Sequence, residues 1–271
     1  MTTYLITGGA GSLGRELVRE IHARDPRDIV RVIDINEAGL AMLKHPTRRI
    51  YGDICNQDRI DFAMRHVDIC IHAAAMKNLE IAEYNIDAVL RTNVQGTLSV
   101  ARAAMKRQVS HAIFISSDKA VHPTTAYGAS KAMGEKTWFW AHRIQNRSTF
   151  SILRSGNFME SRGNVFEVWD EQVRNGQPIT ITDPEMERYF VKTADVAKLI
   201  LDMPRWVQGG EIVIPVMQSR KIIDLAEEMH PGHERRIIGA RPGEKITEEL
   251  TDSHERVVRV EKDCKVIERG P

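Results

Sequence analysis

Three features are scarce in this sequence, and each scarcity excludes a class of protein. The three cysteines, Cys55, Cys70 and Cys264, are odd in number and form no close pair, which argues against a disulfide framework and a zinc site. No apolar run approaches the roughly 20 residues that a membrane helix needs, and glycine appears by position 8, too early for a signal peptide. The formal net charge is +1, so neither nucleic acid nor a membrane is an expected partner. We expect a cytoplasmic protein in which any anion site is local.

The chain itself has the composition of a globular enzyme-sized protein. Its 271 residues are 42% hydrophobic and 28% charged, enough to bury a substantial core. Up to residue 155, short apolar runs alternate with longer amphipathic stretches, which predicts an α/β fold, a Rossmann-like doubly wound parallel sheet. From residue 156 to 271 the segments are shorter and interrupted by proline, which predicts a smaller C-terminal lobe with some segments returning to the first domain. The predicted strands are Thr3–Thr7, Ile29–Asp34, Arg49–Tyr51, Asp68–His72, His111–Ser116 and Thr149–Arg154.

A glycine-rich loop lies between the first predicted strand and the first helix. "YLITGGAGSLGREL" places Gly9, Gly11 and Gly14 in a G-x-G-x-x-G pattern, which lets backbone approach a pyrophosphate at a helix N-terminus. Asp34 follows twenty positions after Gly14, where a carboxylate would bind the adenosine ribose and repel a 2′-phosphate, favouring NAD over NADP. Asp53 is a similar candidate for the adenine. A tight turn without a ligand, and a strand-end cap at Asp34, are the alternatives.

The stretch "SSDKAVHPTTAYGASK" carries a tyrosine and a lysine at helical spacing. Tyr127 and Lys131 are four residues apart at the start of a predicted helix, so their side chains share one face. A lysine ammonium beside a phenol stabilises the phenolate and lowers a pKa of about 10. Such a tyrosine can act as a base on a hydroxyl while hydride leaves for a nicotinamide. The alternative is a surface tyrosine near a solvated lysine.

Three residues of the same stretch directly follow the predicted strand "HAIFIS". Residues just past the carboxyl end of a parallel strand face the ligand crevice. Ser117 can hydrogen-bond the reacting hydroxyl, and with Tyr127 it is nearly all that an epimerase or a simple dehydrogenase needs. Asp118 and Lys119 add a second acid–base pair, as a β-elimination of water requires: one group removes a proton next to a ketone and the other protonates the departing hydroxyl. A solvated turn with a helix-capping aspartate is the alternative.

These segments together resemble a known family. "TGGAGSLG", "HAAAMKNLEIAEYN", "RTNVQGT", "SSDKAVHPTTAYGASK", "RSGNFMESRGNV", "ITDPEMERYFV" and "GARPGEKITEEL" are similar to motifs of the extended short-chain dehydrogenase/reductases. They look like the soluble, inverting UDP-N-acetylglucosamine 4,6-dehydratases of polysaccharide biosynthesis, in order from about Thr3 to Ile267. The resemblance implies an NAD(P)-binding Rossmann domain with the catalytic residues at 1–155, a lobe at 156–271 that mainly binds a UDP-sugar, and a homo-oligomer, a dimer through two long helices or higher.

The resemblance also implies roles for the catalytic residues. Tyr127 would take the proton of the sugar 4-hydroxyl, with Lys131 lowering its pKa and holding the nicotinamide ribose. Lys119 would remove the proton of carbon 5 while Asp118 protonates the leaving 6-hydroxyl, and hydride would pass from carbon 4 through the cofactor to carbon 6. Two positions indicate the short inverting branch of the family. This sequence has "DK" where glucose-type dehydratases have aspartate–glutamate, and it has a tyrosine where long membrane-anchored relatives have methionine.

Matching motifs supply the expected binding residues. Arg241 offers a planar fork for phosphate oxygens, Arg188 is a second phosphate candidate, and Glu244 can accept from the uridine ribose; singly, each could equally be structural. The ten histidines show no metal-ligand spacing, so no metal is expected. The cofactor set is Gly8, Gly11, Ser12, Leu13, Gly14, Asp34, Asp53, Ile54, Ala73, Ala74, Asn93, Tyr127 and Lys131, and the substrate set is Lys77, Asn157, Arg188, Arg241 and Glu244.

Some positions depart from the family and keep alternatives open. Ser117 stands where the family has threonine, and Ser155 replaces an aromatic residue. Asp34 departs from relatives that prefer NADP. The exact sugar and the cofactor preference therefore stay open. A nucleotide-sugar 4-epimerase would use Ser117, Tyr127 and Lys131 and would need no function of Lys119. A dinucleotide-sensing protein without turnover is the non-enzymatic alternative.

Overall fold

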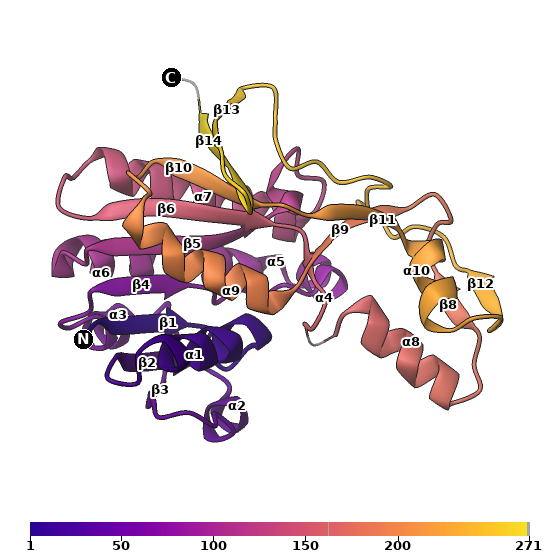
Figure 1. Cartoon of the computed structure of the whole chain (residues 1–271), viewed down its shortest axis with the longest axis horizontal. Helices are drawn as coiled ribbons and strands as arrows, with labels where there is room; N and C mark the ends of the chain where they lie inside the picture. Colours follow the sequence, from indigo (N-terminus) through magenta and orange to yellow (C-terminus); the bar gives the residue numbers. More distant parts are fainter. Residues whose placement is uncertain (162, 270–271) are drawn as a thin grey trace.

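The main body is a nine-stranded sheet with the order β13-β14-β10-β6-β5-β4-β1-β2-β3 (Figure 1). It is seen in a computed structural model that describes residues 1–161 and 163–269. The neighbouring strands β10, β6, β5, β4, β1, β2 and β3 pair in parallel. The hairpin β13-β14 adds to β10 in antiparallel fashion and forms one edge of the sheet. This architecture confirms the predicted α/β fold. The strands are β1 (Thr3–Thr7), β2 (Ile29–Asp34), β3 (Arg48–Tyr51), β4 (Ile69–His72), β5 (His111–Ser117), β6 (Thr149–Ser155), β10 (Glu211–Pro215), β13 (Glu255–Val260) and β14 (Cys264–Arg269).

Helices cover both faces of this sheet because its central strands are apolar on both sides. In β5, Ile113 and Ile115 pack into one cluster, whereas Ala112 and Phe114 pack into the other. The first face carries α1 (Ser12–Arg24) and α9 (Thr193–Asp202). The second face carries α3 (Gln57–Ala63), α6 (Thr97–Arg107) and α7 (Ala126–Arg143).

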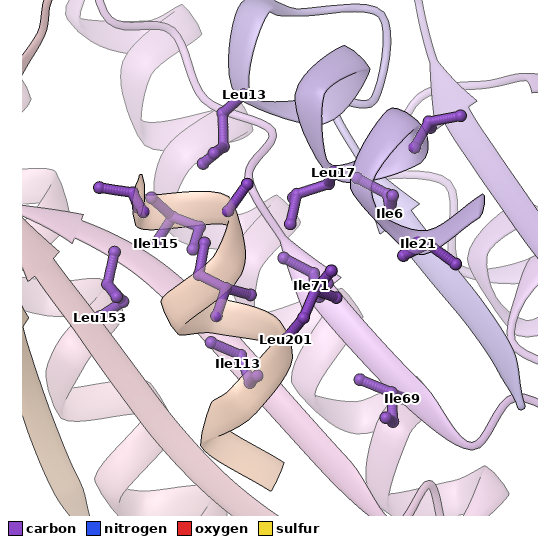
Figure 2. Packing of buried hydrophobic residues seen from close by; sticks show 14 of the residues in the cluster. Ile6, Leu13, Leu17, Ile21, Ile69, Ile71, Ile113, Ile115, Leu153 and Leu201 are labelled. Carbon is purple, nitrogen blue, oxygen red and sulfur yellow. The ribbon is translucent and has the colours of Figure 1, made fainter. Parts of the chain in front are cut away.

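Figure 2 shows the first of these two clusters from close by. Leu17 and Ile21 of α1 point toward Ile71 of β4, and Leu201 of α9 comes from the other side. Leu17 is completely buried, as the predicted helical spacing of the apolar residues in this segment requires. Packing of α1 against both the sheet and α9, which lies beside it on the same face, fixes the start of α1, where the glycine loop lies.

A smaller lobe extends from the carboxyl ends of the strands, at the right of Figure 1. It has its own buried cluster around Trp169, whose indole donates to the carbonyl of Thr180 at 3.1 Å. The predicted division of the chain at residue 155 stays a prediction. The lobe comprises α8 (Val165–Arg174), α10 (Ile222–Met229), the sheet β11-β9-β7 (Gln218–Lys221, Glu187–Val191 and Asn157–Phe158) and the pair β12-β8 (Arg235–Ile237 and Ile179–Ile181).

Short elements fill the edge of the sheet that faces this lobe. They include α2 (Glu37–Ala41), α4 (Leu79–Tyr84), α5 (Ile86–Val89), a π-helical segment (Leu90–Gly96) and a 3-10 turn at Asp118–Ala120. A second 3-10 turn, Met203–Arg205, follows α9 at the opposite edge, where Asp202 pairs with Arg24 of α1. In the part of the chain that the structure describes, no helix combines the length and apolar character needed to cross a bilayer. The parallel strands β1, β2, β4, β5 and β6 all end at this edge, which collects the predicted functional residues.

Candidate active site

The glycine loop after β1 has the tight geometry that a dinucleotide loop requires. Gly8 has φ +69°, and a Cβ there would lie 2.7 Å from the backbone of Ala74. A Cβ on Gly14 would lie 2.3 Å from the Cα of Gly9, so α1 packs directly against the loop. The helix begins after Gly11 without a side-chain cap, and the N-terminus of a helix attracts an anion. The loop therefore fits a pyrophosphate.

Two predicted cofactor carboxylates lie at the ends of neighbouring strands. The Asp34 carboxylate accepts from the amides of Ala10 at 3.0 Å and Asn36 at 2.9 Å, so it ties the glycine loop to the end of β2. Asp53 accepts from the amide of Cys55 at 2.8 Å and from Arg91 at 2.9 Å. Their direct contacts with ribose and adenine stay predictions.

Asn93 fastens the segment after β4 rather than pointing freely into the crevice. Its amide exchanges hydrogen bonds with the backbone of Met76 at 2.8 and 2.9 Å, and donates to the hydroxyl of Ser130 at 2.9 Å. The side chain lies in the π-helical segment, a helix type that is often found at functional sites. Asn93 therefore positions the predicted cofactor residues Ala73 and Ala74 relative to α7.

Tyr127 and Lys131 share the first turns of α7, as their spacing predicts. The helix starts with Thr125, whose hydroxyl accepts from the amide of Gly128 at 3.1 Å. The Lys131 side chain is buried, and its Nζ donates to the carbonyl of Ile115 at 2.7 Å and lies 5.9 Å from the Tyr127 ring centre. The structure thus brings this pair together behind the end of β5.

The predicted effect of Lys131 on the tyrosine is wrong for the protein on its own. Burial raises the pKa of Tyr127, the charge of Asp118 raises it further, and the hydrogen bond with Ser117 acts in the opposite direction. Burial also lowers the pKa of Lys131 to about 7, against a smaller opposing effect of Glu135. The sequence pattern considers only the ammonium beside the phenol, whereas burial is the largest cause of both pKa shifts and Lys131 is not among the causes of the shift at Tyr127.

Ser117, Asp118 and Lys119 form a connected cluster at the end of β5. Asp118 is fully buried, and its Oδ1 accepts from Ser117 Oγ at 2.7 Å and from Lys119 Nζ at 3.1 Å. Its Oδ2 is buried without a hydrogen-bond partner among the described residues. A Cβ on Gly128 would lie 2.3 Å from the Lys119 carbonyl, so α7 and this turn are packed in direct contact. An acid–base pair and the tyrosine–lysine pair are therefore adjacent.

Two further charged residues, which the sequence analysis did not single out, complete the cluster. Glu248 Oε1 lies 3.5 Å from Lys119 Nζ, and Glu248 Oε2 lies 3.6 Å from Lys245 Nζ. Both residues occur within the quoted motif "GARPGEKITEEL", but no spacing rule links this motif to "SSDK". The pocket beside Lys119 is lined by Leu79, Lys119, Thr124, Thr125, Gly243, Glu244, Lys245 and Glu248.

The predicted substrate residues are not gathered equally at this pocket. Glu244 lines it, with its Oε2 accepting from the amide of Arg241 at 3.1 Å, while Arg241 itself is exposed. Asn157 donates to the carbonyl of Tyr189 at 3.2 Å. Burial lowers the pKa of Lys77, and the nearby charge of Glu167 opposes this.

Arg188 departs from its predicted role as a phosphate ligand. It is buried, and its guanidinium donates to the carbonyls of Glu187 at 2.8 Å, Ile246 at 2.9 Å and Lys245 at 2.8 Å. These bonds hold the backbone of the Glu244–Glu248 segment. The sequence could not show this, because a buried arginine and a phosphate-binding arginine have the same sequence pattern.

No metal site is found in the described part of the chain. Residues 1–161 and 163–269 contain no group of three His, Cys, Asp or Glu side chains suited to hold an ion.

Known proteins resemble this chain over most of its length. An uncharacterized membrane protein of Methanocaldococcus jannaschii is 39% identical over 266 residues, 92% of this chain and 80% of that protein. A UDP-N-acetylglucosamine 4,6-dehydratase (inverting) of Campylobacter jejuni is 35% identical, covering 92% of this chain and 77% of that protein. A UDP-glucose 4-epimerase of Rickettsia bellii is 33% identical, covering 93% and 78%. The chain spans only 45% of the capsular polysaccharide biosynthesis protein CapD of Staphylococcus aureus, at 33% identity.

Solved structures and a family pattern agree with these relatives. Pen from Bacillus thuringiensis has a TM-score of 0.90 and 30% identity, covering 99% of this chain and 89% of that one. The dTDP-glucose 4,6-dehydratase DesIV of Streptomyces venezuelae, solved with NAD, has a TM-score of 0.84 at 23% identity, covering 92% and 88%, and shares the fold. The pattern of the polysaccharide biosynthesis protein family matches residues 4–268. The chain therefore belongs to this family of extended short-chain dehydrogenase/reductases, which confirms the resemblance carried by its motifs.

Proposed function

We propose that the protein is a nucleotide-sugar 4,6-dehydratase that acts on a UDP-sugar, with UDP-N-acetylglucosamine as the expected substrate and inversion at carbon 5. The observation that carries this proposal is the pair of the buried Asp118 and the partly buried Lys119 next to Tyr127. Oxidation and reduction at carbon 4 need only the serine, the tyrosine and the lysine of α7. The elimination of water needs a second acid–base pair, and Asp118 and Lys119 can supply it. The dehydratase of Campylobacter jejuni, at 35% identity, supports the same assignment.

The residues present fit NAD as the cofactor. The loop from Gly8 to Gly14 would hold the pyrophosphate, and Asp34 would hold the adenosine ribose. Bound NAD would supply a reversible hydride acceptor and a positive charge beside the phenol. DesIV, which has the same fold, was solved with NAD. We infer NAD rather than NADP because the Asp34 carboxylate would repel a 2′-phosphate.

The proposed chemical steps assign one role to each of these side chains. Tyr127 accepts the proton of the 4-hydroxyl as carbon 4 is oxidised, with Ser117 orienting that hydroxyl. Lys119 takes the proton of carbon 5, and the electron pair of that C–H bond forms the carbon 5–carbon 6 double bond. The 6-hydroxyl leaves as water with a proton from Asp118. Return of the hydride removed from carbon 4 to carbon 6, and addition of a proton to the opposite face of carbon 5, then give the 4-keto-6-deoxy sugar.

Product analysis tests the dehydratase directly. Purified protein incubated with NAD and UDP-N-acetylglucosamine is expected to give a product lighter by one water, measured by mass spectrometry. Lys119→Ala should reduce the rate of water loss by about 10²–10⁴-fold, the usual contribution of a general base, while keeping oxidation at carbon 4, followed by the absorbance of the reduced nicotinamide. NMR of the product formed in deuterium oxide reports the configuration at carbon 5.

A 4-epimerase is the second candidate, because a relative of that name is 33% identical over 93% of this chain. It would produce the 4-epimer at unchanged mass, and Lys119→Ala would have almost no effect on its rate. An unchanged substrate mass across a panel of UDP- and dTDP-sugars would exclude the dehydratase.

A further inference from the structure

Glu248 is a buried carboxylate that none of the steps above uses. Its side chain is 4% exposed, and its two oxygens lie 3.5 Å from Lys119 Nζ and 3.6 Å from Lys245 Nζ. Glu248 Oε2 is buried without a hydrogen bond among the described residues. Burial of a carboxylate with incomplete hydrogen bonding destabilises a protein. Such an arrangement is more readily explained by chemistry than by stability.

The backbone that carries Glu248 is fixed against the catalytic turn at several points. Thr124 Oγ1 donates to the carbonyl of Gly243 at 2.6 Å, and Gly243 has φ +75°. Lys245 Nζ donates to the carbonyl of Val121 at 2.6 Å. Arg188 holds the carbonyls of Lys245 and Ile246 from the other side. The distance between Glu248 and Lys119 is therefore set by the fold and not by a mobile side chain alone.

Lys119 lies between two carboxylates that come from different parts of the chain. Asp118 belongs to its own turn, and Glu248 comes from the segment that precedes β13. Lys245 faces Glu248 from the opposite side to Lys119, and Glu244 lines the same pocket. Two lysines and two carboxylates thus alternate as Asp118, Lys119, Glu248 and Lys245. This alternation balances the charges. It also gives Lys119 a second acidic neighbour: Asp118 is assigned to protonate the leaving group, whereas Glu248 is not.

We propose that Glu248 is a positioning residue for the elimination step, acting through Lys119; this inference rests on the proposed dehydratase function. Glu248 holds Lys119 Nζ toward the pocket and stabilises the ammonium that forms when Lys119 takes the proton of carbon 5. Lys119 then releases this proton to solvent, and carbon 5 receives a proton on its opposite face, as inversion requires, so Glu248 gains and loses none. Asp118 is thereby left to supply its proton to the departing hydroxyl.

The same segment links substrate binding to this step. Arg241 and Glu244, the predicted nucleotide ligands, precede Glu248 in one continuous stretch of chain. A UDP-sugar that binds to this stretch would therefore lie beside the preformed pair of Glu248 and Lys119. Residues of one segment would then serve both substrate binding and the elimination step.

Two variants at position 248 and a neighbouring control test the proposal. In Glu248→Gln, water loss is expected to slow by at least about tenfold, less than the roughly 10²–10⁴-fold expected for the base itself, while oxidation at carbon 4 is retained. The acid limb of the pH–rate profile for water loss should move to lower pH, because removal of the carboxylate favours the neutral amine of Lys119. Glu248→Asp should restore the wild-type position of the acid limb and part of the rate of water loss. Glu249→Gln is the control, because that adjacent side chain is 62% exposed.

The outcomes separate the possible roles. A Glu248→Gln variant with wild-type water loss and an unmoved acid limb overturns the proposal, as does an equal loss of carbon-4 oxidation, which would indicate a structural role. Should Glu248→Gln not fold, Glu248→Asp decides: slower water loss with intact carbon-4 oxidation supports the proposal, and parallel loss of both overturns it. If the wild type loses no water from any sugar while oxidising carbon 4, the proposed function fails and this proposal fails with it.

Discussion

At the scale of single residues, the site is governed by burial. Lys131 lies behind the end of β5 with its ammonium bonded to one carbonyl and 4.6 Å from the centre of the Phe114 ring. Cation–π attraction and one hydrogen bond only partly replace the water that this group loses. The pKa of about 7 therefore reflects a free-energy cost of keeping Lys131 charged inside the protein.

This cost has a defined pH dependence. An unfolded lysine has a pKa of about 10.4, and the folded value is about 7, so between these values the unfolded chain binds more protons. Stability must then rise with pH through this window, by at most about 1.4 kcal/mol per pH unit. Lys131→Met removes the titrating group and with it this pH-dependent contribution to the free energy of unfolding. We expect the free energy of unfolding of the wild type, measured by urea denaturation, to rise from pH 7 to 9 relative to that of Lys131→Met. Parallel pH profiles of the two proteins would contradict this.

The sequence predicts local relations at the site better than distant ones. Tyr127 and Lys131 share a face because they are one helical turn apart, and Asp118 and Lys119 reach the crevice because they follow a parallel strand. The direction of the Tyr127 pKa shift could not be predicted, since it depends on packing that brings α7 against β5. Glu248 could not be placed either, because its approach to Lys119 depends on a turn at Gly243 and on Arg188.

At the scale of elements, a buried ion network connects β5, β6, α7 and β13. Arg154 is 1% exposed and binds both Glu135, at 2.7 Å, and Glu255, at 2.7 Å. Glu135 also accepts from the hydroxyl of Ser116 at 2.6 Å. Because Glu135 is one turn after Lys131 in α7, this network fixes the helix that carries Tyr127 and Lys131, the predicted catalytic pair. The C-terminal hairpin is thereby attached to the active-site helix.

Removal of the cation from this network should be costly. Arg154→Met leaves two buried carboxylates without their partner, and we expect the free energy of unfolding to fall by about 3–5 kcal/mol, measured by urea denaturation at pH 7. Arg19→Met provides the comparison, since its pair with Glu16 lies at the surface and should contribute at most about 1 kcal/mol. Similar losses in the two variants would show that burial of the network has no special effect.

At the scale of the whole molecule, large apolar side chains remain exposed along neighbouring helices. Tyr84 of α4, Leu90 of the π-helical segment and Met133 of α7 are 85%, 56% and 48% exposed. Helix α7 packs beside both α4 and the π-helical segment. Exposed apolar residues on adjacent elements are typical of an interaction surface, which agrees with the dimer through two long helices that the family resemblance implies.

Light scattering after size exclusion tests this surface. The wild type is expected to elute as a dimer, and Leu90→Glu should shift it toward the monomer, because a charge would be buried at the interface. Val257→Glu, on the exposed strand β13, should leave the mass unchanged. A monomeric wild type, or a dimer that tolerates Leu90→Glu, would remove this surface from consideration.

Most of the architecture is predictable from the sequence, because alternation of strands and helices is a local pattern. Each of the six predicted strands is found within one residue of its expected bounds at either end. The antiparallel hairpin of β13 and β14 was not predicted, since the exposed valines of β13 do not give a clear apolar pattern. Its position depends on pairing with β10, which is distant in the sequence.

The path of the chain between sheet and lobe limits how this protein could be re-engineered. The chain leaves the main sheet after β6 and returns with α9 and β10, then leaves again for β11, α10 and β12 before β13 and β14 close the sheet. The lobe is thus assembled from two inserted segments, and its removal as one piece would also delete β10. To introduce the substrate specificity of a relative, both inserted segments would have to be exchanged together, which creates four junctions. The strands of the main sheet between these segments would stay unchanged.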